Sequence, residues 1–170
     1  MRAYTCYLLN EDEKEKLKKL VGGYAFPSHR ADHVTVNHAA ENADDLPRLN
    51  SVLVYGFASD LKGIEAFLVE VNGERKSPDG RYYHMTWSLN PRQSIPALYE
   101  LYEPNAGVGL TDEQLRYESR HSNAMLRAAF EDSARFVQIR YFAPVEVGVT
   151  PAFVVKDAHG RKTVQRLTQH

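Results

Sequence analysis

The sequence is poor in the features that mark secreted, membrane and duplex-binding proteins. Its 170 residues include a single cysteine, Cys6, so no disulfide can form within the chain, and a reducing, cytoplasmic compartment is expected. No run of 18 apolar residues is present, so no helical membrane span is expected. The start of the chain predicts a strand rather than a signal peptide. Basic residues number 21 and acidic residues 22, so the excess of Lys and Arg typical of proteins that bind long duplexes is missing.

What remains is the composition of an ordinary globular protein. Hydrophobic residues make up 43% of the chain and charged residues 25%. A chain of this length can bury one core, and no linker or low-complexity segment divides it, so a single domain over residues 1–170 is expected. Cys6 lies in an apolar, strand-like run and is expected to be a buried, inert thiol.

The order of predicted elements indicates an α+β fold. Alternation of apolar and polar residues predicts strands, which are expected over residues 3–9, 33–36, 51–59, 64–71, 81–89, 137–142, 145–149, 152–156 and 162–167. Helices are expected from Asn10, which would cap the first of them, to Gly22, then after Ser94, and from Thr111 to Phe136. Helices and mostly antiparallel strands in this proportion suggest an α+β sheet packed on one or both faces.

One short pattern occurs twice. Residues 32–36 read Asp-His-Val-Thr-Val and residues 83–87 read Tyr-His-Met-Thr-Trp, so each holds a histidine and a threonine separated and followed by apolar residues. On a strand, His33 and Thr35 share one face, and so do His84 and Thr86. Random placement of the histidines and threonines would give roughly 0.3 His-x-Thr pairs in this chain. The alternative to a shared site is that the two histidines are unrelated strand residues, each hydrogen-bonded locally.

The paired motifs resemble those of the two-histidine (2H) phosphoesterase superfamily, which is defined by two His-hydrophobic-Ser/Thr-hydrophobic segments. The first segment, continued by Asn37 and His38, is similar to that of cyclic phosphodiesterase domains in tRNA ligases, and small phage proteins that degrade cyclic oligonucleotides are similar as well. The useful match covers about residues 3–102, and the motif histidines lie closer in sequence than in bacterial RNA-ligase-like members. The resemblance implies two lobes of mostly antiparallel sheet with helices packed outside, a central cleft that carries one motif on each lobe, and no metal or cofactor.

The resemblance implies a phosphodiesterase in which His33 and His84 are catalytic and Thr35 and Thr86 hold the phosphate. The chemistry suits these side chains, because a histidine with a pKa near 6.5 can serve as base or acid at neutral pH. The substrate would be a nucleotide or an RNA end, with a 2′,3′-cyclic phosphate or a cyclic oligonucleotide as the expected diester. Which histidine is the base, and the oligomeric state, stay open at this point.

Aromatic residues beside the motifs are candidates for substrate contacts. By alternation Tyr82 shares the face of His84 and could stack on a base, whereas Tyr83 and Trp87 are expected in the core. On the first strand Tyr4 and Tyr7 are three residues apart and so point to opposite faces. At most one of them faces the cleft.

Charged and imidazole groups near the motifs form a second set of candidates. Arg81 could contact phosphate, although a solvated loop explains it equally well. His38 would need a bend to return to the cleft, and a surface position is the simpler expectation. With His29 and His33 it could suggest a metal site, but the ligand spacing does not support one. Two alternatives to an enzyme stay open, namely a nucleotide- or RNA-binding module without turnover and a structural protein with core histidines.

Overall fold

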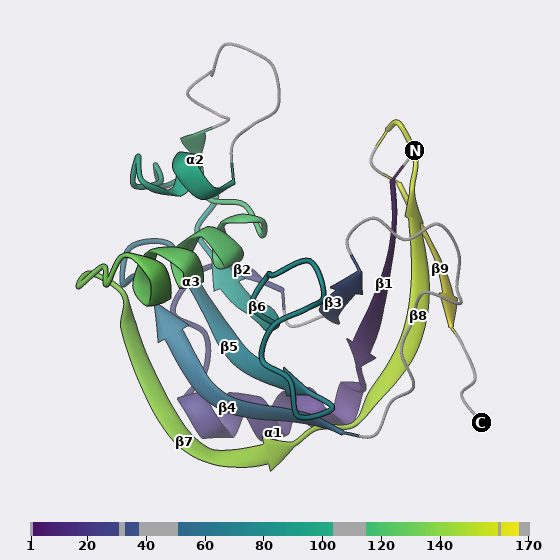
Figure 1. Ribbon diagram of the computed structural model, residues 1–170. Helices are drawn as coiled ribbons and strands as arrows, with labels where there is room; N and C mark the ends of the chain where they lie inside the picture. The colour runs from purple at the N-terminus through teal and green to yellow at the C-terminus, as the bar shows by residue number, and fades with distance from the viewer. Residues whose placement is uncertain (1, 31–32, 38–50, 104–114, 160, 167–170) are drawn as a thin grey trace.

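The computed structural model describes residues 2–30, 33–37, 51–103, 115–159 and 161–166, which form an α+β protein with two antiparallel sheets and few helices (Figure 1). In chain order the elements are β1 (Arg2–Leu9), α1 (Glu11–Val21), β2 (Ser28–His29), β3 (His33–Asn37), β4 (Val52–Ser59), β5 (Ile64–Val71), β6 (His84–Leu89), α2 (Tyr99–Tyr102), α3 (His121–Glu131), β7 (Gln138–Glu146), β8 (Val149–Lys156) and β9 (Lys162–Arg166).

The two sheets each contain one of the repeated motifs. The four-stranded sheet has the order β3-β1-β8-β9 and the five-stranded sheet has the order β2-β6-β5-β4-β7, with antiparallel pairing throughout. Strand β7 ends the larger sheet and is followed at once by β8, so the chain passes directly from one sheet to the other (Figure 1). The first motif therefore lies on β3 and the second on β6.

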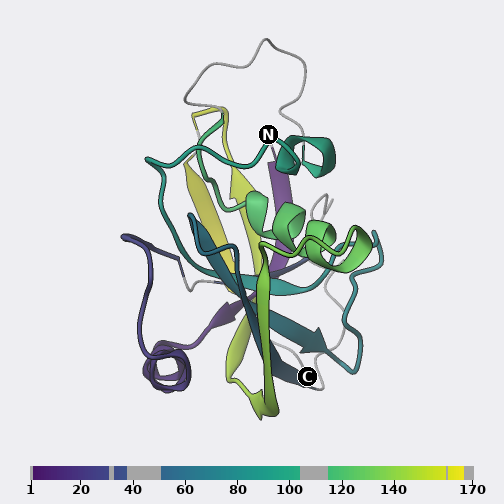
Figure 2. The same cartoon turned by 90° about the vertical axis from the view of Figure 1, so that its left-hand side faces the viewer.

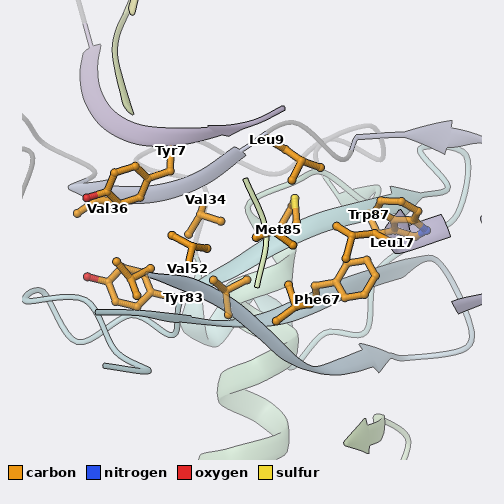
Figure 3. Close-up of a cluster of buried hydrophobic side chains, with 14 residues drawn as sticks. Tyr7, Leu9, Leu17, Val34, Val36, Val52, Phe67, Tyr83, Met85 and Trp87 are labelled. Atoms are coloured by element: carbon orange, nitrogen blue, oxygen red, sulfur yellow. The ribbon is translucent and has the colours of Figure 1, made fainter. Parts of the chain in front are cut away.

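The main core lies where the two sheets approach each other. Side chains of β1 and β3 point toward those of β4, β5 and β6, and Leu17 of α1 joins them (Figure 3). Met85, Trp87 and Phe67 are between 0% and 1% exposed, so large apolar groups fill this space. Complete burial of one such side chain contributes roughly 1.5–3 kcal/mol, which makes this cluster a principal source of stability.

The other face of the five-stranded sheet is covered by α2 and α3. A second core forms there between apolar residues of β4, β5 and α3, and Figure 2 shows α1 well apart from these two helices. A buried carboxylate anchors the layer, because Asp60 accepts hydrogen bonds from the hydroxyls of Tyr99 and Tyr117. The same carboxylate accepts the main-chain N–H groups of residues 62–64, which closes the β4–β5 turn.

Local sequence signals explain the best-defined boundaries. Gly22 adopts the left-handed conformation with φ 81° and ends α1 as expected. Asn72 and Gly73 have φ of 51° and 84°, the left-handed pair that a two-residue hairpin turn requires. The prediction for Asn10 was wrong in its detail: its side chain makes no cap hydrogen bond and instead accepts one from the Thr150 hydroxyl at 2.9 Å.

Two helix predictions need correction. The helix expected after Ser94 is reduced to the single turn α2, because Ser94 forms a β-bridge with Arg116. The same pairing delays the next helix, since residues 115–117 bond to residues 93–95 through main-chain groups. Helix α3 therefore begins at His121 and ends at Glu131, while the proposed cap at Thr111 lies outside the described residues.

The strand predictions hold for the central elements. The expected strands at 3–9, 51–59 and 64–71 correspond to β1, β4 and β5, and 81–89 is shortened to β6. The two strands expected over 137–149 are one continuous strand, β7, and the terminal hairpin β8–β9 is present. Among the helices of the described ranges, none combines the length and apolarity that a membrane span needs.

Candidate functional site

The first motif occupies an edge of the four-stranded sheet. His33 pairs with Leu8 and Thr35 with Cys6 across the β3–β1 ladder. Successive side chains of a strand point to opposite faces, and Val34 and Val36 point into the main core, where they are 1% and 2% exposed. His33 and Thr35 therefore lie on the opposite face of β3, where both side chains are partly buried.

A tyrosine accompanies this histidine. The rings of Tyr4 and His33 lie 5.7 Å apart between centroids, with an angle of 33° between their planes. Tyr7 is completely buried on the other face of β1, so of the two tyrosines in this strand it is Tyr4 that shares the face of the motif. Between them Cys6 is also fully buried, and burial raises the pKa of its thiol to about 12. Cys6 is thus an inert core thiol, as expected.

The second motif lies inside the five-stranded sheet, between β2 and β5. Met85 and Trp87 belong to the same core as Val34 and Val36, and strands β3 and β6 lie beside each other. Tyr83 is 6% exposed on this face as well, which confirms its predicted core position. The apolar halves of both motifs are therefore packed together, and the polar halves lie on the faces turned away from this core.

His84 is held in one orientation by the main chain just before its strand. Its Nδ1 lies 2.8 Å from the main-chain oxygen of Tyr82, and a carbonyl can only accept, so Nδ1 carries the proton. In the neutral ring the lone pair is then on Nε2. Burial lowers the pKa of His84, and the nearby charge of Arg81 lowers it further, against the opposing effects of the Tyr82 carbonyl and Glu103. The lowered pKa keeps His84 a neutral imidazole near neutral pH, with a lone pair on Nε2.

Helix α3 lies along the polar face of β6. The hydroxyls of Thr86 and Ser122 are 2.8 Å apart, and just before the strand begins the ring of Tyr82 lies 5.0 Å from that of Phe130. Thr86 Oγ1 can donate its proton to a phosphate oxygen if Ser122 is the donor in this pair. Ser122 is therefore a candidate site residue that the sequence did not reveal, because its position fits the apolar stripe of the helix.

Arg81 is tied to acidic partners. Its Nη1 lies 2.8 Å from Oε1 of Glu103, and its Nε lies 3.5 Å from Asp79. Asn123 donates to the same Glu103 oxygen at 2.6 Å. These contacts fix the guanidinium beside the second motif, so Arg81 contributes positive charge there while its hydrogen bonds are directed to carboxylates. Sequence reasoning gave no role to Glu103 or Asn123, since neither belongs to a motif.

The contacts of the two histidines arise in different sheets. Those described for His33 involve β1, and those for His84 involve the main chain just before β6 and the charged groups beside it. His38, the remaining predicted contact residue, lies outside the described residues. Within the described ranges, no cluster of three or more His, Cys, Asp or Glu side chains is arranged to hold a metal ion.

The site can thus be assigned a chemistry from its residues. A neutral imidazole and two hydroxyls lie on β6 and α3, a fixed cation lies just before β6, and an imidazole with a hydroxyl lies on β3. Comparison with known proteins returned no matching family model, no matching curated protein and no matching solved structure.

Proposed function

We propose that this protein is a metal-independent phosphodiesterase acting on a nucleotide or RNA-type phosphodiester, with a 2′,3′-cyclic phosphate or a cyclic oligonucleotide as substrate. The observation that supports it most is the repeated His-x-Thr pattern on neighbouring strands of two sheets. In both strands the apolar residues enter one core and leave a histidine and a threonine on the other face. The cleft that joins the two motifs is part of the proposal.

In the proposed reaction His84 is the base. Water attacks phosphorus, its proton passes to Nε2 of His84, and the new O–P bond forms as the bond to the leaving oxygen breaks. Protonated His33 donates its proton to that oxygen. The orientation of His84 supports this assignment, because the Tyr82 carbonyl keeps the proton on Nδ1 and the lone pair on Nε2. Each proton transfer is worth about 10²–10⁴-fold in rate.

The threonines would bind the non-bridging oxygens. Thr35 and Thr86 are partly buried on the same faces as their histidines, where a hydroxyl can orient the phosphate and offset its growing charge. Ser122 leaves a second hydroxyl beside the position of Thr86. Loss of the Thr86 hydroxyl is therefore expected to reduce the rate less than loss of an imidazole.

The test is a turnover assay on 2′,3′-cyclic nucleotides and cyclic dinucleotides. We expect His33→Ala and His84→Ala each to reduce kcat/KM by at least 10²-fold, and Thr35→Ala and Thr86→Ala to reduce it less. His159→Ala is the matched control, because His159 is an exposed histidine in the β8–β9 turn. Circular dichroism spectra of all variants should coincide, and turnover should persist in EDTA.

Two outcomes would redirect the proposal. Full activity in both histidine variants would remove the proposed acid–base pair. Binding of the diesters by the wild-type protein with no turnover would favour the alternative, a nucleotide- or RNA-binding module on the same scaffold.

A further inference from the structure

A pocket of about 460 Å³ lies at the C-terminal end of α3, on the α3 side of the five-stranded sheet. Four aromatic side chains and two basic side chains from separate parts of the chain line it, together with Glu74: Tyr55, Arg75, Lys76, Tyr82, Phe130 and Tyr141. Its size is within the range of small-molecule sites, about 300–1,000 Å³.

The aromatic rings form the walls of this pocket. Tyr55 and Tyr141 are nearly parallel, with 11° between their planes and 6.3 Å between centroids. The rings of Tyr82 and Phe130 meet at 5.0 Å. Tyr141 is 59% exposed and Phe130 is 36% exposed, so apolar ring area is open to solvent at this point. Clustered exposed aromatic surface of this kind marks a binding site more often than a lone exposed ring does.

The basic residues lie directly on these rings. Cζ of Arg75 is 4.0 Å from the centroid of Tyr55, and Nζ of Lys76 is 4.8 Å from that of Tyr82. The tight turn at Asn72-Gly73 reverses the chain after β5 and so brings this pair to the pocket. Arg75 is partly neutralised by Glu70 at 3.8 Å. In the described part of the chain Lys76 has no carboxylate within 4.0 Å, and its charge acts on Glu131 from a greater distance.

We infer that this pocket binds a nucleotide, with the base stacked on the aromatic rings and a phosphate held by Lys76 and Arg75. A planar ring with an attached anion uses both parts of the lining. Arg75 and Lys76 outweigh the single carboxylate of Glu74 in the lining, so a cationic ligand is disfavoured. An uncharged aromatic ligand would leave the two basic side chains without a role. Stacking on aromatic side chains tolerates any base, so selectivity for nucleotides over nucleosides should come from the phosphate.

The inference does not depend on catalysis by the two motifs. The pocket and the second motif are nevertheless linked, because Tyr82 provides a wall of the pocket through its ring and orients His84 through its carbonyl. A nucleotide in the pocket would therefore lie beside the polar face of β6.

Adenosine monophosphate is the appropriate probe, because it holds a base and a phosphate but no diester that the protein could turn over. Its binding to the full chain is measured by calorimetry, in parallel with adenosine and inorganic phosphate. We expect Phe130→Ala and Tyr141→Ala each to weaken binding by about 5- to 150-fold, the range for loss of one base–aromatic stack. Lys76→Glu should weaken binding of the nucleotide and leave that of adenosine unchanged.

Matched controls come from exposed residues outside the pocket. Phe136 is 42% exposed, close to the value for Phe130, and Lys62 is an exposed lysine in the β4–β5 turn. Phe136→Ala and Lys62→Glu should bind the nucleotide like the wild type. The inference is overturned if the wild type binds no adenosine monophosphate at millimolar concentration, or if inorganic phosphate binds as tightly. It is equally overturned if Phe130→Ala and Tyr141→Ala bind normally, or if the controls lose as much affinity.

Discussion

Acidification should destabilise this protein through one buried histidine, His121, at the start of α3. Its side chain is 0% exposed and is packed against the rings of Tyr99 and Tyr117. The main-chain N–H of Glu118 donates to Nδ1 at 2.9 Å, so Nδ1 must carry a lone pair and the ring must be neutral. Protonation would place two N–H groups against each other and put a charge in the core, which Glu100, 3.6 Å from Nε2, offsets only in part.

The size of the effect follows from the pKa of His121. Burial, assisted by the charge of Arg120, lowers this pKa from 6.5 to about 4 in the folded protein. In the unfolded chain the ring takes up its proton near pH 6.5. Stability that is complete above pH 6.5 is therefore lost progressively as the pH falls toward 4. Each unit of difference between the folded and unfolded pKa values is worth 1.36 kcal/mol, so this shift corresponds to about 3 kcal/mol in the free energy of unfolding.

The assay is chemical denaturation at a series of pH values between 7 and 4. The control is His121→Asn, whose side-chain oxygen can accept from the Glu118 N–H but cannot titrate in this range. We expect the variant to be less stable than the wild type at pH 7 and to lose about 3 kcal/mol less on acidification. Other groups titrate equally in both proteins and cancel in the difference. Parallel pH profiles for the two proteins would refute the reasoning.

Three further predictions follow from the packing and the site. Gly63→Ala should cost about 1–3 kcal/mol in denaturant unfolding, because its Cβ would lie 2.3 Å from a ring carbon of Tyr117, and an unchanged midpoint would contradict this. The Cys6 thiol should react with a disulfide reagent only after unfolding, since its raised pKa and burial suppress the thiolate; rapid labelling of the native protein would count against it. With His84 as the base, its lowered pKa should place the acidic limb of the kcat/KM profile below pH 6.5, and a limb above that value would exclude the assignment.

The sequence was most informative where a local signal and the tertiary structure agree. Alternation predicted the burial of Val34, Met85 and Trp87, because a strand with one buried face must place every second residue in the core. The turn at Asn72-Gly73 and the end of α1 at Gly22 are also local, since each depends on a left-handed backbone.

The sequence was least informative where partners come from distant segments. Residues near Arg116 have good helical periodicity, yet they pair with residues near Ser94, and long-range hydrogen bonds override the local preference. Ser122 matches the stripe of α3 and gave no sign that it would contact Thr86. Glu103 lies in a connecting segment, and its contacts with Arg81 depend on the packing of α2 against the sheet. Periodicity assigns a residue to a face but not to a partner on another element.

The strand order of the smaller sheet determines when β3, which carries His33, can be stably incorporated during synthesis. Strand β3 pairs with β1, and β1 pairs along residues 2–9 with residues 149–156 of β8. On a ribosome, β8 emerges only after the whole five-stranded sheet has been translated. Until then β1 and β3 can form only a two-stranded pair, which is marginally stable alone. The strand with His33 is therefore secured by a late, long-range pairing, which is slow and leaves the other edge of β1 open to other chains in the meantime. Nascent-chain stalling before β8 should thus yield a product in which the larger sheet is formed and the first motif is not yet in place.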